Sequence, residues 1–171
     1  MKTKYIGVKI LESAELMTKA EYCKVRGWDV PSDEDPNEQV YLVEYEPTEN
    51  NASNHVAYSG YISMSPKDVF EEAYRPTTGM TFGLAVEAMK KGNKIARAGW
   101  NGKDMFVVYS PGSTDLPADR FFTPALKDHA INRGGTMTVR PCMMLKTAQD
   151  DVAYWSPSGS DALAEDWIIV D

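Results

Sequence analysis

The chain has 171 residues, of which 43% are hydrophobic and 25% charged, and it carries a net charge of −7 at neutral pH. This size and composition predict a folded protein with one core or two small ones, and the acidic balance argues against binding to DNA or RNA polymers. Apolar runs extend over only a few residues, and no signal-peptide pattern opens the chain. We therefore expect no membrane-spanning helix and a protein of the cytoplasm.

The first half of the chain contains signals for short helices and strands. Thr18 and Glu21 have the spacing of a capping box, which predicts a helix over 19–26 that ends at Gly27. Aromatic and β-branched residues predict a strand over 41–45. The remaining signals of this half are polar loops at 29–39 and 46–56 and a second helix start, capped by Ser65 with Asp68 three residues on.

In the second half, Thr81 is predicted to cap a helix that ends at Gly92. Asn101-Gly102 is typical of a tight hairpin turn, and it joins predicted strands at 94–98 and 105–109. Three further strands are predicted, over 138–145, 152–155 and 167–170, and Pro141 marks an edge or a bulge in the first of them. An insertion at 111–136 contains a predicted helix over 124–131. A short helix is predicted to start at Ser158, with Asp161 three residues on.

Five motifs recur in the same order in the two halves. The first set is Met17-Thr18, Arg26-Gly27-Trp28, YLVEY at 41–45, YISMSP at 61–66 and DVFEEAY at 68–74. The second set is Met80-Thr81, Arg97-Ala98-Gly99-Trp100, MFVVY at 105–109, VAYWSP at 152–157 and DALAEDW at 161–167. We therefore predict an α+β protein of short helices packed on antiparallel sheet, built from two repeat-like units at 1–79 and 80–171.

The sequence gives little support to the common enzyme and metal classes. It holds two cysteines, Cys23 and Cys142, and two histidines, His55 and His129, whose spacing fits neither a disulfide framework nor a zinc site. It also lacks a phosphate-binding glycine loop, a nucleophile elbow and a dinucleotide fingerprint. We expect no cofactor, no metal and no catalytic residue.

Two segments of the second half combine aromatic side chains with polar groups. Trp100 follows Arg97 beside the Asn-Gly turn. Trp155 precedes Ser158 and Asp161 at a helix start, where hydroxyls and backbone N–H groups bind anions and ribose well. Taken alone, each segment fits a structural role better, the first as a core tryptophan with a salt-bridged arginine and the second as a capped helix.

The same segments resemble a known family. FGLAVEAMKKG at 82–92, IARAGWNGK at 95–103, and WSPS at 155–158 followed by DALAEDWII at 161–169 closely resemble the phage family of Thoeris anti-defence protein two. The resemblance implies a non-enzymatic protein that sequesters a small cyclic nucleotide signal in the cytosol of the host bacterium. The implied signal is a glycocyclic ADP-ribose isomer made by bacterial Toll/interleukin-receptor domains, or, in some members, a cyclic di- or trinucleotide.

The resemblance also implies a homo-oligomer, commonly a tetramer, with pockets between protomers. The first unit looks like the extension that often precedes this domain. A ligand of adenine, riboses and phosphates needs an aromatic face, phosphate donors and polar groups for its ribose edges. The ligand-binding residues expected on this basis are Arg97 or Lys103 for phosphate, Trp100 or Trp155 for stacking, and Asn101, Ser158 and Asp161 for hydroxyls or a base edge.

Two other functions stay open from the sequence. One is an enzyme that degrades the signal instead of holding it, which heat denaturation distinguishes because a sequestered ligand is released intact. The other is a protein-binding module or small toxin whose acidic first unit engages a basic host partner. Residues 1–79 hold 14 Asp or Glu against 8 Lys or Arg, which is the observation behind this alternative.

Overall fold

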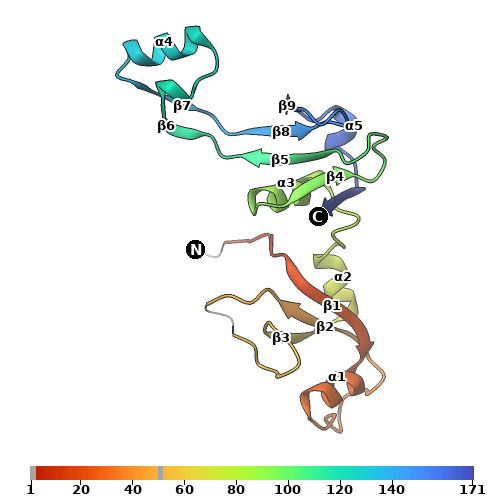
Figure 1. The fold of residues 1–171 in the computed structure, drawn as a ribbon. Helices are drawn as coiled ribbons and strands as arrows, with labels where there is room; N and C mark the ends of the chain where they lie inside the picture. The colour runs from red at the N-terminus through yellow and green to blue at the C-terminus, as the bar shows by residue number, and fades with distance from the viewer. Residues whose placement is uncertain (1–2, 50–51) are drawn as a thin grey trace. The chain divides into compact units, whose positions relative to one another are not determined.

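The computed structural model describes residues 3–49 and 52–171, so two residues of the polar loop at 46–56 lie outside it. The chain divides into two compact units between Arg75 and Pro76. In both units short helices pack on antiparallel sheets, which confirms the predicted α+β class (Figure 1). Within the described ranges, no helix has the length and apolar character needed to cross a membrane.

The first unit is built on a three-stranded antiparallel sheet in the order β1-β2-β3. Its elements are β1 (Leu11–Thr18), α1 (Lys19–Arg26), β2 (Gln39–Tyr45), β3 (Ile62–Pro66) and α2 (Lys67–Ala73). The core between α1 and the sheet contains the buried side chains of Tyr22, Val40, Leu42 and Ile62. Burial of these apolar groups stabilises the packing of α1 on the sheet.

Helix α1 begins and ends as the sequence predicts. Glu21 N donates to Thr18 Oγ1 at 3.2 Å, and Thr18 N donates to Glu21 Oε2 at 2.7 Å, which completes the capping box. Gly27 ends the helix with φ 68°, a conformation that glycine adopts without a steric penalty. The prediction that Ser65 caps α2 is wrong, because the Ser65 hydroxyl donates to the carbonyl of Pro66 and the helix starts without a side-chain cap.

Lys19 ties the polar loop after α1 to the start of that helix. Its buried ammonium lies 2.6 Å from Glu34 Oε2 and also pairs with Glu38. The hydrogen bonds to Glu34 and Glu38 raise the pKa of Lys19 above its ordinary value, so the side chain stays charged although it is buried. The backbone N–H groups of Lys19 and Ala20 donate to the carbonyls of Glu38 and Pro36, so the loop also satisfies the first turn of α1.

Strand β2 carries a buried acid, Glu44, which is 7% exposed. Its Oε1 accepts hydrogen bonds from Ser59 N at 2.9 Å, Ser59 Oγ at 3.1 Å and Gly60 N at 3.0 Å, and its Oε2 accepts one from Ser13 Oγ at 3.0 Å. The bond from Gly60 N is the main cause that holds the pKa of Glu44 below its usual range. Glu44 therefore joins β1, β2 and the loop before β3 as an ionised carboxylate.

The second unit contains a five-stranded antiparallel sheet in the order β10-β4-β5-β8-β9 and a two-stranded sheet, β6-β7. Its elements are α3 (Phe82–Lys90), β4 (Lys94–Arg97), β5 (Phe106–Ser110), β6 (Ser113–Pro117), the 3₁₀ helix η1 (Ala118–Arg120), α4 (Pro124–Asn132), β7 (Thr136–Val139), β8 (Cys142–Lys146), β9 (Val152–Trp155), α5 (Gly159–Ala162) and β10 (Trp167–Val170). Helix α3 packs over β10, β4 and β5, where Ile95, Val107 and Trp167 are fully buried. Thr81 caps α3 by accepting from Leu84 N, as the sequence predicts.

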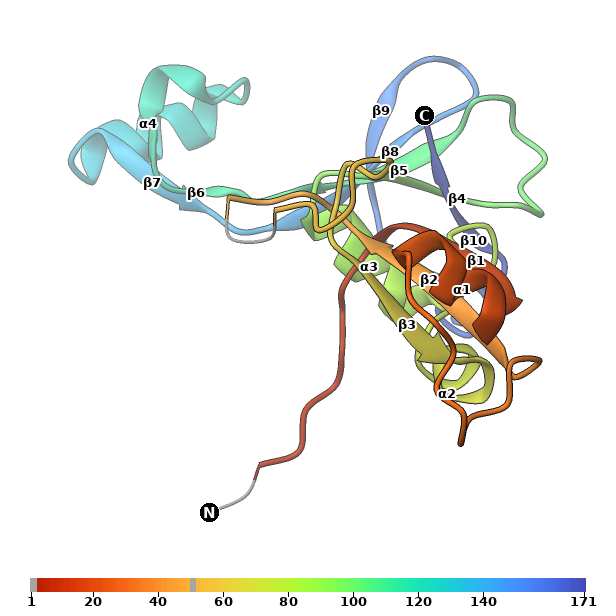
Figure 2. The ribbon, with the colours of Figure 1, turned by 90° about the horizontal axis from the view of Figure 1, so that it is seen from below.

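Strands β6 and β7 extend from the five-stranded sheet as an arm that carries α4 (Figures 1 and 2). The ladder between β5 and β8 stops at Ser110, and the ladder between β6 and β7 starts at Ser113. Pro111 and Pro141 lie in the interval on the two strands, and proline has no N–H to donate. The single strand predicted over 138–145 is therefore wrong, because Pro141 lies between two separate strands, β7 and β8.

The tight turn predicted at Asn101-Gly102 does not form. An eight-residue loop at 98–105 joins β4 to β5, and the register of these strands has a single Cα pair, Ile95 with Val107. The ring of Trp100 lies 5.6 Å from the ring of Trp167 on another strand. This long-range contact fixes the loop in a conformation that a two-residue turn does not allow.

The two units share the order of the five motifs but not the order of the strands. The motifs at 41–45 and 62–66 lie on adjacent strands in the first unit, whereas β8 separates the matching strands β5 and β9 in the second. The Arg-Gly-Trp motif ends a helix in the first unit, and its counterpart ends strand β4 in the second. The two repeat-like units predicted from these motifs therefore do not share one topology.

We expect Glu44→Gln to lower the free energy of unfolding by about 1–3 kcal/mol at neutral pH, the usual loss when a buried charged acceptor is altered. The pKa of Glu44 is lowered in the folded state, so the ionised carboxylate stabilises the fold. This stabilisation is complete at pH values above the ordinary carboxyl pKa and is lost as the pH falls through the lowered pKa of the folded state. The difference between variant and wild type should therefore shrink on acidification, as measured by urea unfolding followed by circular dichroism.

The matched control for this substitution is Glu46→Gln, which alters an exposed glutamate next to the same strand. An equal loss of stability in both variants would contradict a special role for the buried carboxylate.

Candidate functional site

Four aromatic side chains of the second unit form one cluster, and Trp167 at its centre is fully buried. Its ring centroid lies 5.3 Å from that of Phe82, 5.6 Å from that of Trp100 and 6.0 Å from that of Trp155. Trp100 and Trp155 also contact each other at 6.1 Å. The tryptophan planes meet at 72° to 76°, an edge-to-face arrangement that is favourable for aromatic rings.

This cluster links the two edges of the five-stranded sheet. Trp155 ends β9 and Trp167 begins β10, and these are the two edge strands. The edges of a flat five-stranded sheet lie about 19 Å apart, since neighbouring strands are separated by about 4.8 Å. A distance of 6.0 Å between the two rings therefore indicates that the sheet curls and brings its edges toward each other. The connection at 156–166, which includes α5, crosses from one edge to the other.

Arg97, the last residue of β4, is held by two carboxylates of this connection. Its Nε donates to Asp166 Oδ1, and its Nη1 donates to Asp161 Oδ1 at 2.9 Å. Asp166 Oδ2 also accepts from Gly99 N at 3.2 Å, and the backbone carbonyl of Asp161 accepts from Trp167 Nε1 at 3.0 Å. One guanidinium thus fastens the loop after β4, helix α5 and the start of β10 to each other.

The start of α5 is a capping box, as the sequence predicts. Asp161 N donates to Ser158 Oγ at 3.1 Å, while Ser158 N and Ser158 Oγ donate to Asp161 Oδ2 at 3.0 Å and 2.6 Å. The Ser158 hydroxyl is the main cause that lowers the pKa of Asp161, and the Arg97 guanidinium is the main cause that lowers the pKa of Asp166. Both carboxyl groups are therefore ionised at neutral pH.

The structure brings most of the predicted ligand-binding residues together. Hydrogen bonds link Arg97 to Asp161 and Asp161 to Ser158, which form a polar set. The rings of Trp100 and Trp155 contact each other and form an aromatic set. Trp167 contacts both sets, through the ring of Trp100 and through the Asp161 carbonyl. The other two predicted residues, Asn101 and Lys103, lie exposed on the loop after β4. Arg97 and Asp161 are paired with each other, whereas Asn101 and Lys103 are exposed residues.

Trp167, Asp166 and Phe82 also belong to this group, and none of them is among the site residues predicted from the sequence. Asp161, Asp166 and Trp167 all lie in the segment DALAEDW, so the recurrence of this motif was the available hint. Its spacing does not reveal Arg97 as the common partner of the two acids, because Arg97 lies more than sixty residues earlier in the chain.

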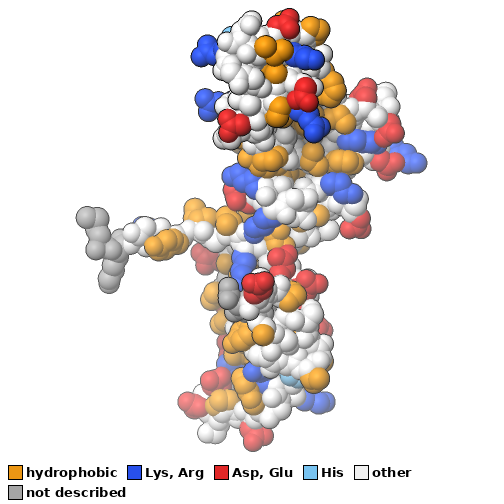
Figure 3. All heavy atoms as spheres, turned by 60° about the vertical axis from the view of Figure 1, so that its left-hand side comes forward, with side chains coloured by type: hydrophobic (Ala, Val, Ile, Leu, Met, Phe, Trp, Pro, Cys, Tyr) orange, Lys and Arg blue, Asp and Glu red, His pale blue; other side chains and the backbone are white. Residues whose placement is uncertain are grey.

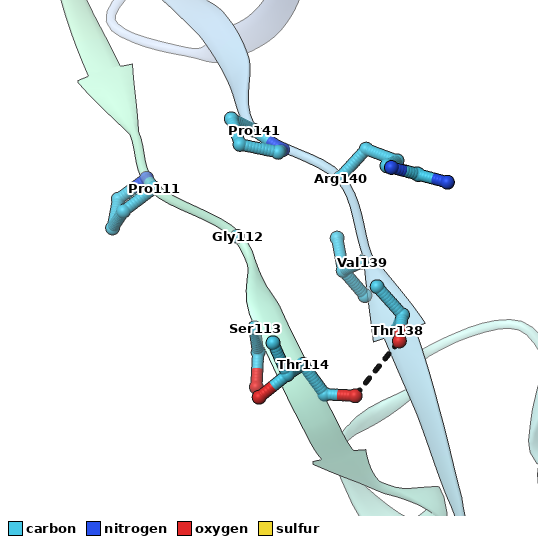
Figure 4. A pocket seen from close by; sticks show the side chains of 8 residues that line it. All are labelled: Pro111, Gly112, Ser113, Thr114, Thr138, Val139, Arg140 and Pro141. Carbon is cyan, nitrogen blue, oxygen red and sulfur yellow. Dashed lines mark hydrogen bonds between the residues drawn. The ribbon is translucent and has the colours of Figure 1, made fainter.

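A cleft of about 380 Å³ lies at the neck of the arm, which is the interval between the β5–β8 ladder and the β6–β7 ladder (Figure 4). It is lined by Pro111, Gly112, Ser113, Thr114, Thr138, Val139, Arg140 and Pro141. Thr138 Oγ1 donates to the carbonyl of Thr114 at 2.8 Å beside it. None of the predicted site residues lines this cleft. Across residues 3–49 and 52–171, no group of three His, Cys, Asp or Glu side chains is placed to hold a metal ion.

Comparison with known proteins assigns the second unit to a family. Residues 80–170 match the Thoeris anti-defense 2-like domain. The chain belongs to this family. It is similar to Thoeris anti-defense 2 of Bacillus phage SP01, with 36% identity over 96 residues that cover 54% of this chain and 97% of that protein. The resemblance inferred from the sequence motifs is therefore confirmed.

Membership in the Thoeris anti-defense 2-like family supports a bacteriophage function directed against the Thoeris defence. The matched region contains all the predicted site residues, from Arg97 to Asp161. The first unit, which ends at Arg75, lies outside that region. The match to the family is therefore confined to the second unit.

We expect Arg97→Met to raise the pKa of Asp166 more than that of Asp161, because Arg97 is the main cause of the lowered pKa at Asp166 only. The free energy of unfolding should fall by about 1–2 kcal/mol, less than for a fully buried pair because Asp166 is partly exposed to solvent. Carboxyl-carbon NMR titration measures both pKa values, and thermal unfolding measures the loss of stability.

The control is Arg140→Met, which removes an exposed arginine from the same unit and should change neither pKa. Equal shifts at Asp161 and Asp166 in the Arg97 variant would contradict the different roles assigned to Arg97 and Ser158.

Proposed function

We propose that this protein binds a cyclic nucleotide immune signal of the glycocyclic ADP-ribose type and sequesters it without degrading it. The match of residues 80–170 to the Thoeris anti-defense 2-like domain is the observation that carries the proposal. The site offers the groups that such a ligand needs, namely aromatic surface, an exposed cation, an exposed amide and hydroxyls at a helix start. The place of action is the cytoplasm of the host bacterium, where the signal is made.

Lys103 and Asn101 are the residues that we assign to phosphate and to ribose or base-edge contacts. Both side chains are exposed. The loop that carries them is tethered by the hydrogen bond from Gly99 N to Asp166. A tethered loop loses less conformational freedom when a ligand binds, which favours affinity.

Trp100 and Trp155 provide the aromatic surface for a base, and Ser158 provides a hydroxyl on the connection that follows Trp155. Both rings are half-buried and meet each other edge to face, so a base would stack on the surface that remains open. We assign Arg97 and Asp161 chiefly to positioning these groups, because their charged atoms already bind each other at 2.9 Å. A phosphate would have to compete with two carboxylates for Arg97.

The protonation states at the site favour binding over catalysis. A general acid that works near neutral pH needs a raised pKa, whereas the surroundings lower the pKa of both Asp161 and Asp166. Both acids are also paired with Arg97. Cys142 and His129, the remaining candidates for nucleophile and base, lie on β8 and on α4 of the arm.

A heat-release experiment tests sequestration. Purified protein is incubated with the glycocyclic ADP-ribose signal, separated from free ligand and denatured by heat, and the released molecule is identified by mass spectrometry. We expect the intact signal, because the lowered pKa values of Asp161 and Asp166 make both carboxyl groups poor general acids near neutral pH. Recovery of opened or hydrolysed products would instead establish an enzyme that degrades the signal.

Two variants locate the site when their affinity for the same signal is measured by calorimetry. Lys103→Ala and Asn101→Ala should each weaken binding about tenfold to hundredfold, the usual effect of losing a hydrogen bond to a charged ligand, with unchanged melting temperatures. Lys127→Ala, which alters an exposed lysine on α4, is the matched control for Lys103→Ala. Wild-type affinity in both site variants, measured by calorimetry, would place the ligand elsewhere.

We further propose that the protein is a homo-oligomer, with a tetramer as the favoured form. The support is the face of the five-stranded sheet opposite α3. Strand register places Val108, Met144 and Tyr154 side by side on this face, with Val107 on the α3 side. Tyr154 is 80% exposed, and Val108 and Met144 are only half-buried. An apolar sheet face of this kind is typically covered by a symmetric partner.

Native mass spectrometry should give a mass close to four times the 19.1 kDa of the chain. Tyr154→Glu should reduce the assembly, because it introduces a charge into the apolar face. Val56→Glu is the control, since Val56 is fully exposed in a loop of the first unit. A mass of 19.1 kDa for the wild type at micromolar concentration would contradict the proposal.

A further inference from the structure

The tip of the loop between β4 and β5, residues 101–104, carries the two side chains that we assign to the ligand, Asn101 and Lys103. Exposed charges of both signs are spread over the face of the chain that Figure 3 shows, so exposure alone does not distinguish this tip. A hydrogen bond and ring contacts tether the loop as far as Trp100. Among the residues that the structure describes, no hydrogen bond or ion pair ties the tip to another segment. Any order in the tip must therefore come from packing.

The half-buried side chain of Met105 packs against the backbone of this tip at Gly102. The Met105 sulfur lies 1.9 Å from the position that a Cβ atom would take on Gly102, and the Met105 Cγ lies 2.8 Å from it. The Cβ of Ala148 lies 3.2 Å from the same position. The place of a side chain at residue 102 is thus already filled by the thioether of Met105, which is flexible enough to fit an irregular space of this kind.

Ala148 belongs to the turn between β8 and β9, which keeps its shape without the help of the loop. Thr147 N donates to the Asp151 carbonyl at 2.9 Å, and Gln149 N donates to Thr147 Oγ1 at 3.2 Å. The Thr147 hydroxyl in turn donates to the Asp151 carboxylate. All three hydrogen bonds lie within the turn, so Ala148 is a fixed support beside which Met105 meets Gly102.

The backbone of the tip reverses its direction immediately before Met105. Lys103 and Asp104 form a turn, and Asp104 adopts φ 54°. This left-handed conformation is unfavourable for a residue with a side chain and persists where the surrounding structure holds it. The reversal brings residue 105 back toward Gly102, three residues earlier. Packing of Met105 on Gly102 is therefore the contact in a position to maintain this turn.

We propose that Met105 is a positioning residue of the ligand site, whose thioether holds the tip in the conformation that presents Asn101 and Lys103. Gly102 admits the thioether, and Ala148 supports it. A tip that is already ordered loses less conformational freedom when the ligand binds, which favours affinity. The proposal rests on the proposed function for the role of the two presented side chains, whereas the packing that orders the tip is tested without ligand.

The first experiment is backbone ¹⁵N relaxation of the full-length protein without ligand, read at residues 101–104. We expect order parameters of about 0.85 in the wild type, as in rigid backbone, and below about 0.6 in Met105→Ala. Gly102→Ala should lower them as well, because its methyl group needs the place that the sulfur occupies. The double variant Gly102→Ala with Met105→Ala should recover the order, because the new methyl group then fills the place that the sulfur has left.

The second experiment measures the affinity of the same proteins for the glycocyclic ADP-ribose signal by calorimetry. Each single variant should bind about tenfold more weakly than the wild type, and the double variant should bind nearly as well as the wild type. Met137→Ala, which truncates a half-buried methionine on β7, is the control for Met105→Ala. Gly7→Ala, where an added Cβ meets no atom within 4 Å, is the control for Gly102→Ala.

Three results would overturn the proposal. They are a mobile tip in the wild type, an ordered tip or wild-type affinity in Met105→Ala, and no recovery of order in the double variant. A wild-type protein that does not bind the signal would contradict the proposed function instead, and the relaxation experiment would still decide whether Met105 orders the tip.

Discussion

The second unit depends on the packing of Trp167 between the two edges of its sheet. Strands β9 and β10 are consecutive in the chain but lie at opposite edges, so the connection between them has to cross the sheet. Trp167 makes this possible because its ring contacts Trp155 of the far edge, Trp100 of the loop after β4 and Phe82 of α3. The polar groups of the candidate site lie on the loop after β4 and on the connection at 156–166, both of which contact Trp167. The arrangement of the candidate site and the packing of the core therefore depend on the same ring.

Charged groups join distant segments in both units, and each is surrounded by partners. Glu44 accepts four hydrogen bonds, Lys19 binds two glutamates, and Arg97 binds two aspartates. A buried charge without such partners is strongly unfavourable, so these groups permit only the arrangement in which all their partners are present. Apolar burial supplies the general stabilisation of each unit, and the charged groups specify which loops lie where.

The sequence predicts best where the deciding contacts are local. The start and end of α1 follow from Thr18, Glu21 and Gly27, because a cap acts on the backbone only a few residues away. The capping box at Ser158 follows for the same reason. The turn at Asn101 fails because the distant contact of Trp100 with Trp167 outweighs its local preference.

Strand order and site contacts are long-range properties, and the sequence shows them less well. The recurrence of motifs is visible in the residues, but the insertion of β8 between β5 and β9 is not, since no motif of the first unit corresponds to it. Family resemblance indicates which residues gather at the site. It does not show that Arg97 is already bound by Asp161 and Asp166. Because of this pairing, we propose that the exposed side chains of the neighbouring loop make the ligand contacts.

The interrupted ladder at the neck of the arm separates the hairpin of β6 and β7 from the five-stranded sheet of the second unit. Pro111 and Pro141 donate no hydrogen bonds across the neck, and Gly112 crosses it with φ 71°, where an added side chain would meet the Val139 carbonyl oxygen at 2.2 Å. Cooperative unfolding spreads along continuous hydrogen-bonded structure, so the break confines it. The hairpin of β6 and β7 with α4 can therefore unfold, or be cut by a protease, while the tryptophan cluster and its ion pairs stay folded.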